Sequence, residues 1–171
     1  MLIDADVRKG TQSALLGHGQ GLTAFLNGDT DSYADLIIQG SSGFDFIPSG
    51  IIPPNPAELL MSTRLEELIA QLKTTYDYIF IDTTPVFQVA DAAIVSRVAD
   101  VNLFVMRIGV EDKRILPEVE KLQTTGKLHN LSVVLNGCRL HNGYGYGYGY
   151  GYGYGYGYGY GHQGSSRKKK K

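Results

Sequence analysis

The sequence predicts an α/β protein built on a doubly wound, mainly parallel sheet. Three observations support this: apolar runs that do not alternate with polar residues, helical patterns between those runs, and a composition of 43% hydrophobic and 19% charged residues in a chain of 171. Runs that stay apolar at successive positions suit strands of a parallel sheet covered on both faces. Such strands are expected at five places: 1–6, 44–48, 76–81, 101–108 and 131–135.

Helical patterns lie between the expected strands. The clearest begins at Asn55, with Pro56 at the first helical position and Glu58 three residues after the cap. An apolar face at helical period follows it: Met61, Leu65, Leu68, Ile69 and Leu72. Further helices are expected at four places: 12–16, 21–26, 91–98 and 117–126. Strands alternating with helices in this way predict βαβ units with right-handed crossovers.

Composition divides the chain into two parts. Residues 1–141, the expected folded domain, carry 11 Lys or Arg and 17 Asp or Glu, a net charge of −6. Residues 142–171, the expected flexible tail, alternate glycine with nine tyrosines and end in five basic residues. The acidic body argues against nucleic-acid binding. The single cysteine excludes an internal disulfide, and no apolar run reaches the roughly 18 residues of a membrane span.

Acidic residues follow two of the expected strands. Asp4 and Asp6 close the first strand and point to the same side, because strand side chains alternate, while Asp82 closes the strand over 76–81. Ligands of open α/β sheets bind beyond the carboxyl ends of the strands. An apolar run ending in Asp is typical of a magnesium site beside nucleotide phosphates. The repeated pattern favours such a site, and helix capping or simple solvation is the alternative.

Several motifs, in order along the chain, resemble the cytoplasmic catalytic domain of bacterial protein-tyrosine kinases (BY-kinases), which are P-loop ATPases related to the partition ATPases. Residues 2–9 (LIDADVRK) resemble their Walker A′ motif, and residues 79–86 (IFIDTTPV) resemble their Walker B motif. Further stretches complete the match: 21–23, 48–60, 133–136 and the tyrosine-rich tail. Thr84 departs mildly, since many members have a second small residue or Pro there. The resemblance implies a partition-ATPase-like fold.

The family's Gly-x-x-x-x-Gly-Lys-Ser/Thr loop has no counterpart in the 171 residues. In the family this P-loop precedes the Walker A′ strand, wraps the phosphates with backbone N–H groups and supplies a neutralising Lys. We therefore expect the chain to be the C-terminal part of a kinase domain, truncated at the N-terminus of its fold and inactive by itself. A naturally short, non-catalytic relative is the alternative.

The resemblance implies roles for individual residues. It assigns magnesium coordination to Asp6 and Asp82, and orientation or deprotonation of the acceptor tyrosine to Asp4. Arg8 is expected either to bind a phosphate of ATP or to pair with a neighbouring acid. Asn136 is expected either to read the adenine edge or to close its strand into a turn with the next residue. The implied autophosphorylation sites are Tyr144, Tyr146, Tyr148, Tyr150, Tyr152, Tyr154, Tyr156, Tyr158 and Tyr160.

The implied function is that of a tyrosine kinase that uses ATP and Mg²⁺ to phosphorylate its own C-terminal tyrosines, and so regulates capsular or extracellular polysaccharide synthesis and export. The implied partners are further copies of the chain, membrane-anchored polysaccharide export proteins and a tyrosine phosphatase. The implied location is cytoplasmic, at the inner face of the plasma membrane, through membrane segments missing here or supplied by a partner. Two alternatives are a partition- or positioning-type ATPase and a non-enzymatic acceptor or scaffold phosphorylated by an intact kinase.

Overall fold

The structure, a computed structural model, describes residues 1–40, 43–110 and 112–138. The chain divides into two parts after Cys138, and all the described residues belong to the first part. The domain boundary expected at 141/142 and all nine tail tyrosines lie outside the described residues. No helix within the described ranges is long and apolar enough to cross a membrane.

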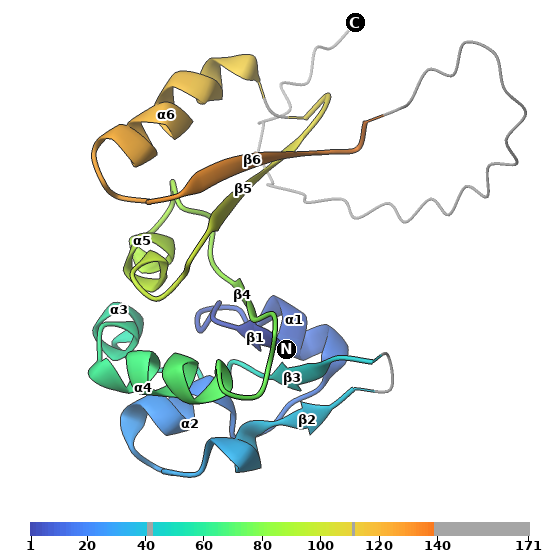
Figure 1. The fold of residues 1–171 in the computed structure, drawn as a ribbon, viewed down its shortest axis with the longest axis vertical. Coiled ribbons are helices and arrows are strands. Elements are labelled where there is room, and N and C mark those ends of the chain that lie inside the picture. Colours follow the sequence, from blue (N-terminus) through green and yellow to red (C-terminus); the bar gives the residue numbers. More distant parts are fainter. Residues whose placement is uncertain (41–42, 111, 139–171) are drawn as a thin grey trace, which may run out of the picture. The chain divides into compact units, whose positions relative to one another are not determined.

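Four strands form a sheet in the order β2–β3–β1–β4 (Figure 1). β1 (Leu2–Asp4) pairs in parallel with both β3 (Asp45–Ile47) and β4 (Phe80–Asp82), and β2 (Ile38–Gln39) pairs antiparallel with β3. The mainly parallel sheet predicted from the apolar runs is therefore confirmed. The strands are shorter than those runs, and the two-residue strand β2 was not predicted.

Two further strands, β5 (Asn102–Arg107) and β6 (Leu131–Asn136), form a separate parallel pair among the described residues. The connection between them contains η2 (Lys113–Ile115) and α6 (Leu116–Thr124). Several apolar side chains of this pair are exposed: Leu103, Val105, Val133, Val134 and Leu135. The expectation that these runs are covered on both faces is wrong for this pair within the described residues, because exposed side chains lie on both faces, Val134 on one and Val133 and Leu135 on the other.

Helices occupy the connections within the first sheet and after it. The bounds of these helices are α1 (Thr11–Leu16), α2 (Gly21–Asn27), η1 (Tyr33–Leu36), α3 (Pro56–Leu60), α4 (Thr63–Leu72) and α5 (Asp91–Ser96). The helix predicted from Asn55 is thus two helices. Between them Ser62 has an extended backbone, with φ −63° and ψ 149°. The prediction placed one continuous apolar face across this break.

The break between α3 and α4 is held by a side chain from a distant part of the sequence. Nη2 of Arg97, the residue after α5, donates to the carbonyl oxygens of Leu60 and Ser62 at 2.7 and 2.9 Å. A continuous helix would satisfy these carbonyls internally. Met61, expected on the apolar face, is instead 63% exposed, because the break rotates it away from the core.

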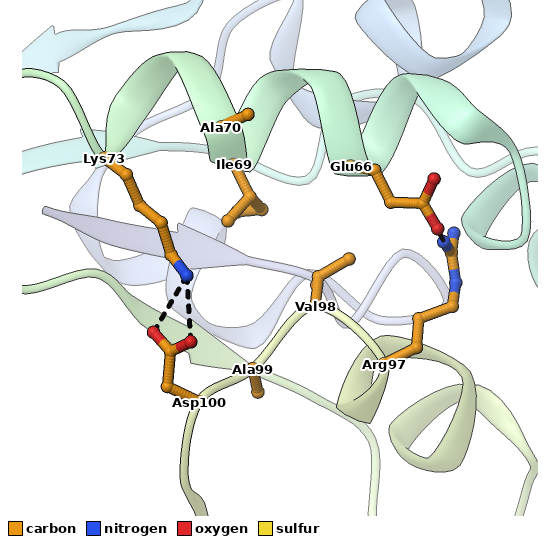
Figure 2. Close-up of a pocket in the computed structure, with 8 residues that line it drawn as sticks. All are labelled: Glu66, Ile69, Ala70, Lys73, Arg97, Val98, Ala99 and Asp100. Carbon is orange, nitrogen blue, oxygen red and sulfur yellow. Dashed lines mark hydrogen bonds and ion pairs between the residues drawn. The ribbon is translucent and has the colours of Figure 1, made fainter.

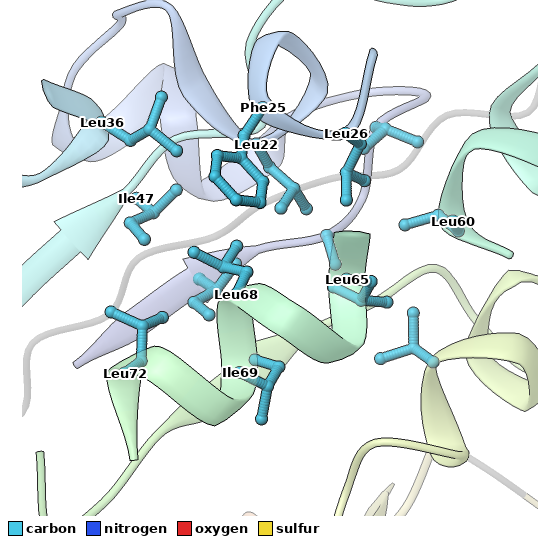
Figure 3. Close-up of a cluster of buried hydrophobic side chains, with 14 of the residues drawn as sticks. Leu22, Phe25, Leu26, Leu36, Ile47, Leu60, Leu65, Leu68, Ile69 and Leu72 are labelled. Carbon is cyan, nitrogen blue, oxygen red and sulfur yellow. The ribbon is translucent and has the colours of Figure 1, made fainter. Parts of the chain in front are cut away.

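The core of the first sheet lies against α2 and α4 (Figure 3). Four residues of α4 are buried at the predicted helical spacing: Leu65, Leu68, Ile69 and Leu72. They belong to one cluster with side chains from α2, α3, η1 and β3: Leu22, Phe25, Leu26, Leu36, Ile47 and Leu60. Each fully buried side chain of this size stabilises the fold by about 1.5–3 kcal/mol. The packing of α4 thus fixes the sheet whose strand ends carry the acids.

The start of α2 and the loop after β3 are joined through their backbones. The N–H groups of Leu22 and Thr23 donate to the carbonyls of residues 48 and 49, at 2.7 and 3.0 Å. Gly21 and Gly50 both have positive φ, +66° and +86°, and a Cβ on either would collide with the other segment. Both segments are among those that resemble the kinases, and the contact ties them into one structural unit.

Candidate nucleotide and metal site

The carboxyl ends of β1 and β4 bring the strand-end acids together. The register between the two strands pairs Asp4 with Asp82. One residue further, the N–H of Ala5 donates to the carbonyl of Asp82 at 2.8 Å. Because parallel strands end at the same edge of a sheet, Asp4 at the end of β1 and Asp6 just after it share that edge with Asp82 from β4. The three acids singled out in the sequence therefore lie at one place in the fold.

Asp4 is enclosed and fully hydrogen-bonded. Its side chain is 0% exposed, and its Oδ2 accepts hydrogen bonds from the backbone N–H and the hydroxyl of Ser13, at 2.7 and 2.6 Å. Its Oδ1 accepts from the N–H of Asp6 at 3.1 Å. Ser13 is linked in turn to Ser49, whose N–H donates to the Ser13 hydroxyl at 2.8 Å. Neither serine was predicted from the sequence to be a site residue; the available signal was the place of Ser13 in the first turn of α1.

Asp6 opens the loop between β1 and α1. It is 6% exposed, and its Oδ1 accepts from the N–H groups of Arg8 and Lys9 at 3.3 and 3.1 Å. Such hydrogen bonds from the following backbone N–H groups to an Asp side chain form a local turn. The turn fixes the Asp6 carboxylate beside the end of β4.

Asp82 is half-buried, and its surroundings disfavour its charge. Burial raises the pKa of the Asp82 carboxyl, and the negative charges of Asp4 and Asp6 raise it further. Hydrogen bonds from the Gln12 side chain and the Thr83 backbone act in the opposite direction and lower this pKa. A cation at this edge would favour the ionised carboxylate.

The donor set fits a hard cation that keeps most of its waters. Mg²⁺ prefers oxygen ligands and is commonly held by only one or two carboxylates, a number that Asp6 and Asp82 could supply. No group of three or more His, Cys, Asp or Glu in the part of the chain that the structure describes is arranged to hold a metal ion. The fit is therefore to a two-carboxylate site, in which water or phosphate supplies the other ligands.

Arg8 forms an ion pair with Asp91, the first residue of α5. Its Nε donates to Oδ2 at 2.6 Å and its Nη2 donates to Oδ1 at 3.0 Å, a bidentate arrangement. The Asp91 side chain is completely buried, whereas that of Arg8 is 37% exposed. The hydrogen bond to Asp91 is the main cause that raises the pKa of the Arg8 guanidinium. Of the two alternatives for Arg8, the structure shows pairing with an acid, and that acid is 83 residues away in sequence.

Asn136 ends β6 in a local turn. Its Oδ1 accepts from the N–H of Gly137 at 2.7 Å, and Gly137 has a positive φ of +73°. This is the turn-forming alternative given for Asn136, and the contact with adenine stays a prediction.

A cavity of about 280 Å³ lies elsewhere, lined by residues of α4 and of the segment that ends α5 and leads to β5 (Figure 2). It is lined by Glu66, Ile69, Ala70, Lys73, Arg97, Val98, Ala99 and Asp100. Two ion pairs stand at its rim, Lys73 with Asp100 at 2.9 Å and Arg97 with Glu66. None of the predicted site residues lines this cavity, and solvent-exposed ion pairs of this kind contribute little free energy.

Solved kinase domains resemble the chain in both sequence and fold. The kinase domain of Escherichia coli tyrosine kinase ETK matches with a TM-score of 0.73 and 34% identity, over 87% of this chain and 59% of that one. The VpsO kinase domain matches with a TM-score of 0.70 and 32% identity, over 81% of this chain and 70% of that one. The chain belongs to the bacterial tyrosine-kinase (BY-kinase) family. The resemblance seen in the Walker-type motifs is thereby confirmed.

Curated relatives agree with this family. Tyrosine-protein kinase YwqD of Bacillus subtilis (strain 168) is 37% identical, over 84% of this chain and 62% of its own length. The chain spans only 15–19% of the length of seven other curated kinases that it matches. No protein-family model matches it.

The partition-ATPase-like fold class is also confirmed. A plasmid partition protein from Borrelia burgdorferi matches the BY-kinase chain with a TM-score of 0.61, over 83% of this chain and 69% of that one. Its identity is 19%, so this likeness concerns the fold alone.

Proposed function

We propose that this chain belongs to an ATP- and magnesium-dependent protein-tyrosine kinase that phosphorylates its own C-terminal tyrosines. The register pairing of Asp4 with Asp82 carries the proposal, since it sets the Walker A′-like and Walker B-like acids at one sheet edge. Membership of the BY-kinase family supports the reaction. Regulation of capsular or extracellular polysaccharide synthesis and export is proposed on family membership alone.

Asp6 and Asp82 are the proposed holders of Mg²⁺. When bound, the cation would neutralise charge on the phosphoryl group as it is transferred. Asp4 is the proposed group that orients or deprotonates the acceptor tyrosine. Because Asp4 is buried and held by Ser13, a tyrosine hydroxyl would have to replace a Ser13 hydrogen bond to reach it.

Nucleotide contacts by Arg8 and Asn136 are proposed in the same way. Arg8 would bind a phosphate by exchanging or sharing its contact with Asp91, and Asn136 would read adenine by releasing its turn with Gly137. Both residues therefore have resting partners that a nucleotide must displace.

The proposed partners follow from the same reaction. Further copies of the chain would present their tyrosines to one another, a tyrosine phosphatase would reverse the modification, and a membrane-anchored export protein would receive the signal. These partners place the protein, by proposal, in the cytoplasm at the inner face of the plasma membrane.

A second candidate function is that of a phospho-acceptor or scaffold without its own activity. The observation that favours it is the run of nine tyrosines over residues 144–160, which can accept phosphoryl groups from another kinase. Such a chain would keep the tyrosines and the acidic edge but would depend on an intact kinase for the phosphoryl group.

One experiment separates these functions. The chain is compared with a chimera that carries, ahead of Met1, the part of YwqD that precedes its matched region, where the family's P-loop is expected, and both are incubated with Mg·ATP. Mass spectrometry then maps phosphotyrosine over residues 144–160, and released phosphate is assayed in parallel. The control is the same chimera with its P-loop lysine replaced by alanine.

The proposed kinase predicts phosphotyrosine in the chimera and none in the control. Phosphate release without phosphotyrosine would instead indicate a partition-type ATPase. An inactive chimera whose tyrosines are phosphorylated by intact YwqD would indicate an acceptor.

A further inference from the structure

Thr84 has a buried hydroxyl without a hydrogen-bond partner. The residue is 6% exposed, and its Oγ1 is one of two buried side-chain oxygens for which the described residues offer no partner. The other is the hydroxyl of Ser62, at the break between α3 and α4. Buried hydroxyls are nearly always paired, since an unpaired one loses its hydrogen bonds to water without replacement. An unpaired hydroxyl is therefore free to bond to a ligand, provided that it lies where a ligand binds.

The position of Thr84, just after β4, indicates which ligand its hydroxyl would contact. Asp4 and Asp82 are paired in parallel register at the ends of β1 and β4. The hydrogen bond from the Ala5 N–H to the Asp82 carbonyl continues this pairing one residue past the end of β1. Continuing this register by two residues places Thr84 opposite Asp6. By this register, the unpaired hydroxyl belongs to the same sheet edge as the two carboxylates proposed to hold the cation.

The hydroxyl has the chemistry that a hydrated cation needs. A cation held by two carboxylates keeps most of its waters, and each of those waters has hydrogens to donate. A threonine hydroxyl can accept one of them while donating its own hydrogen elsewhere. The buried Asp6 carboxylate and the half-buried Asp82 carboxylate cannot alone satisfy every water of such a shell.

We propose that Thr84 is a positioning residue of this site, whose hydroxyl hydrogen-bonds to a water on the cation held by Asp6 and Asp82. The proposal rests on the metal site of the proposed function. It adds a third side chain to the site, one that is not a ligand but fixes the water shell.

The test uses the full chain and Mg²⁺ alone as the probe. Thr84→Val removes the hydroxyl and keeps the shape, Thr84→Ser keeps the hydroxyl, and Ser62→Ala removes the other unpaired hydroxyl as a matched control. Mg²⁺ is titrated while the amide signals of residues 82–84 are followed by NMR. Thermal unfolding of each variant is measured separately without Mg²⁺.

The Thr84→Val variant lacks one hydrogen bond to the water shell, so its dissociation constant for Mg²⁺ should rise by about threefold to tenfold. Thr84→Ser and Ser62→Ala should bind as the unchanged chain does. Without Mg²⁺, Thr84→Val should unfold at the same temperature or higher, because no existing hydrogen bond is lost.

Two results would overturn the proposal while leaving the cation site standing. One is equal Mg²⁺ binding by Thr84→Val and the unchanged chain. The other is a lower unfolding temperature for Thr84→Val without Mg²⁺, which would show that the hydroxyl already has a partner such as a buried water. If the amide signals of the unchanged chain did not shift on addition of Mg²⁺, the proposed cation site itself would be rejected, and this inference with it.

Discussion

Asp4 of β1 and Asp82 of β4 are register partners at the ends of adjacent parallel strands, yet their surroundings differ. Asp4 is wholly enclosed and accepts three hydrogen bonds, two of them from Ser13. Asp82 is half-buried, and burial raises the pKa of its carboxyl. The pairing that gathers the acids thus leaves one of them in an environment that opposes its charge.

Replacing Asp82 by asparagine should stabilise the chain at neutral pH in the absence of a cation. A carboxyl whose pKa is raised by folding binds more protons in the native state than in the unfolded state. Stability is therefore lost as pH rises from the unfolded value near 3.8 through the raised folded pKa. Thermal unfolding should show a gain for Asp82→Asn at pH 7 that shrinks as the pH falls towards 3.8. A destabilised variant at pH 7 would contradict this.

Replacing Asp4 by asparagine should have the opposite effect. The new amide has only one accepting oxygen, and its NH₂ group would face a donor of Ser13 or Asp6. Loss of hydrogen bonds to a charged group should lower the free energy of unfolding by about 1.5–3 kcal/mol. Asp77→Asn, at an exposed position, is the matched control and should change little. Urea unfolding of both variants is the measurement, and equal midpoints would reject the buried network.

The ion pair between Arg8 and Asp91 should support folding, although it is partly exposed. Arg8→Met leaves the buried Asp91 carboxylate without its partner, so the unfolding temperature should fall. Adding Asp91→Leu to Arg8→Met should recover part of the loss, because it removes the stranded charge. Arg114→Met breaks an exposed ion pair with Asp112 and should leave the unfolding temperature unchanged. A loss from Arg8→Met no larger than that control would contradict the prediction.

Local patterns predicted the parts of the fold that depend on neighbouring residues. The helical period of Leu65, Leu68 and Leu72 predicted the buried face of α4, and the runs ending in Asp4 and Asp82 predicted the edge of the sheet. These patterns depend on spacing along the chain, which a sequence displays directly.

The missed features all depend on contacts between distant segments. Arg97 donates hydrogen bonds to carbonyls at the break in the helix expected after Asn55, although it lies more than 30 positions away in the sequence. No residue pattern near Ser62 predicts this break. Asp91 pairs with Arg8 across 83 positions, although an acid in the first turn of a helix usually needs no such partner. The unpaired hydroxyl of Thr84 is a property of packing, and a sequence pattern carries no sign of it.

The chain as given should bind Mg·ATP weakly or not at all. The motif whose backbone N–H groups and lysine would hold the phosphates is missing from its 171 residues. Calorimetry with Mg·ATP should therefore show no saturable heat in the micromolar range. The YwqD chimera is the positive control, and micromolar binding by the unextended chain would contradict this expectation.

The claim that Asp6 and Asp82 hold the cation is tested most directly with Mn²⁺ in place of Mg²⁺. Mn²⁺ broadens NMR signals near its binding site, so it reports where a cation sits in the ¹⁵N-labelled chain. Low concentrations should first broaden the amide signals of residues 4–9 and 82–84, and Asp82→Asn should abolish that selectivity. Broadening that begins instead at exposed acids such as Asp29 and Asp31, or that is the same in Asp82→Asn, would contradict the site.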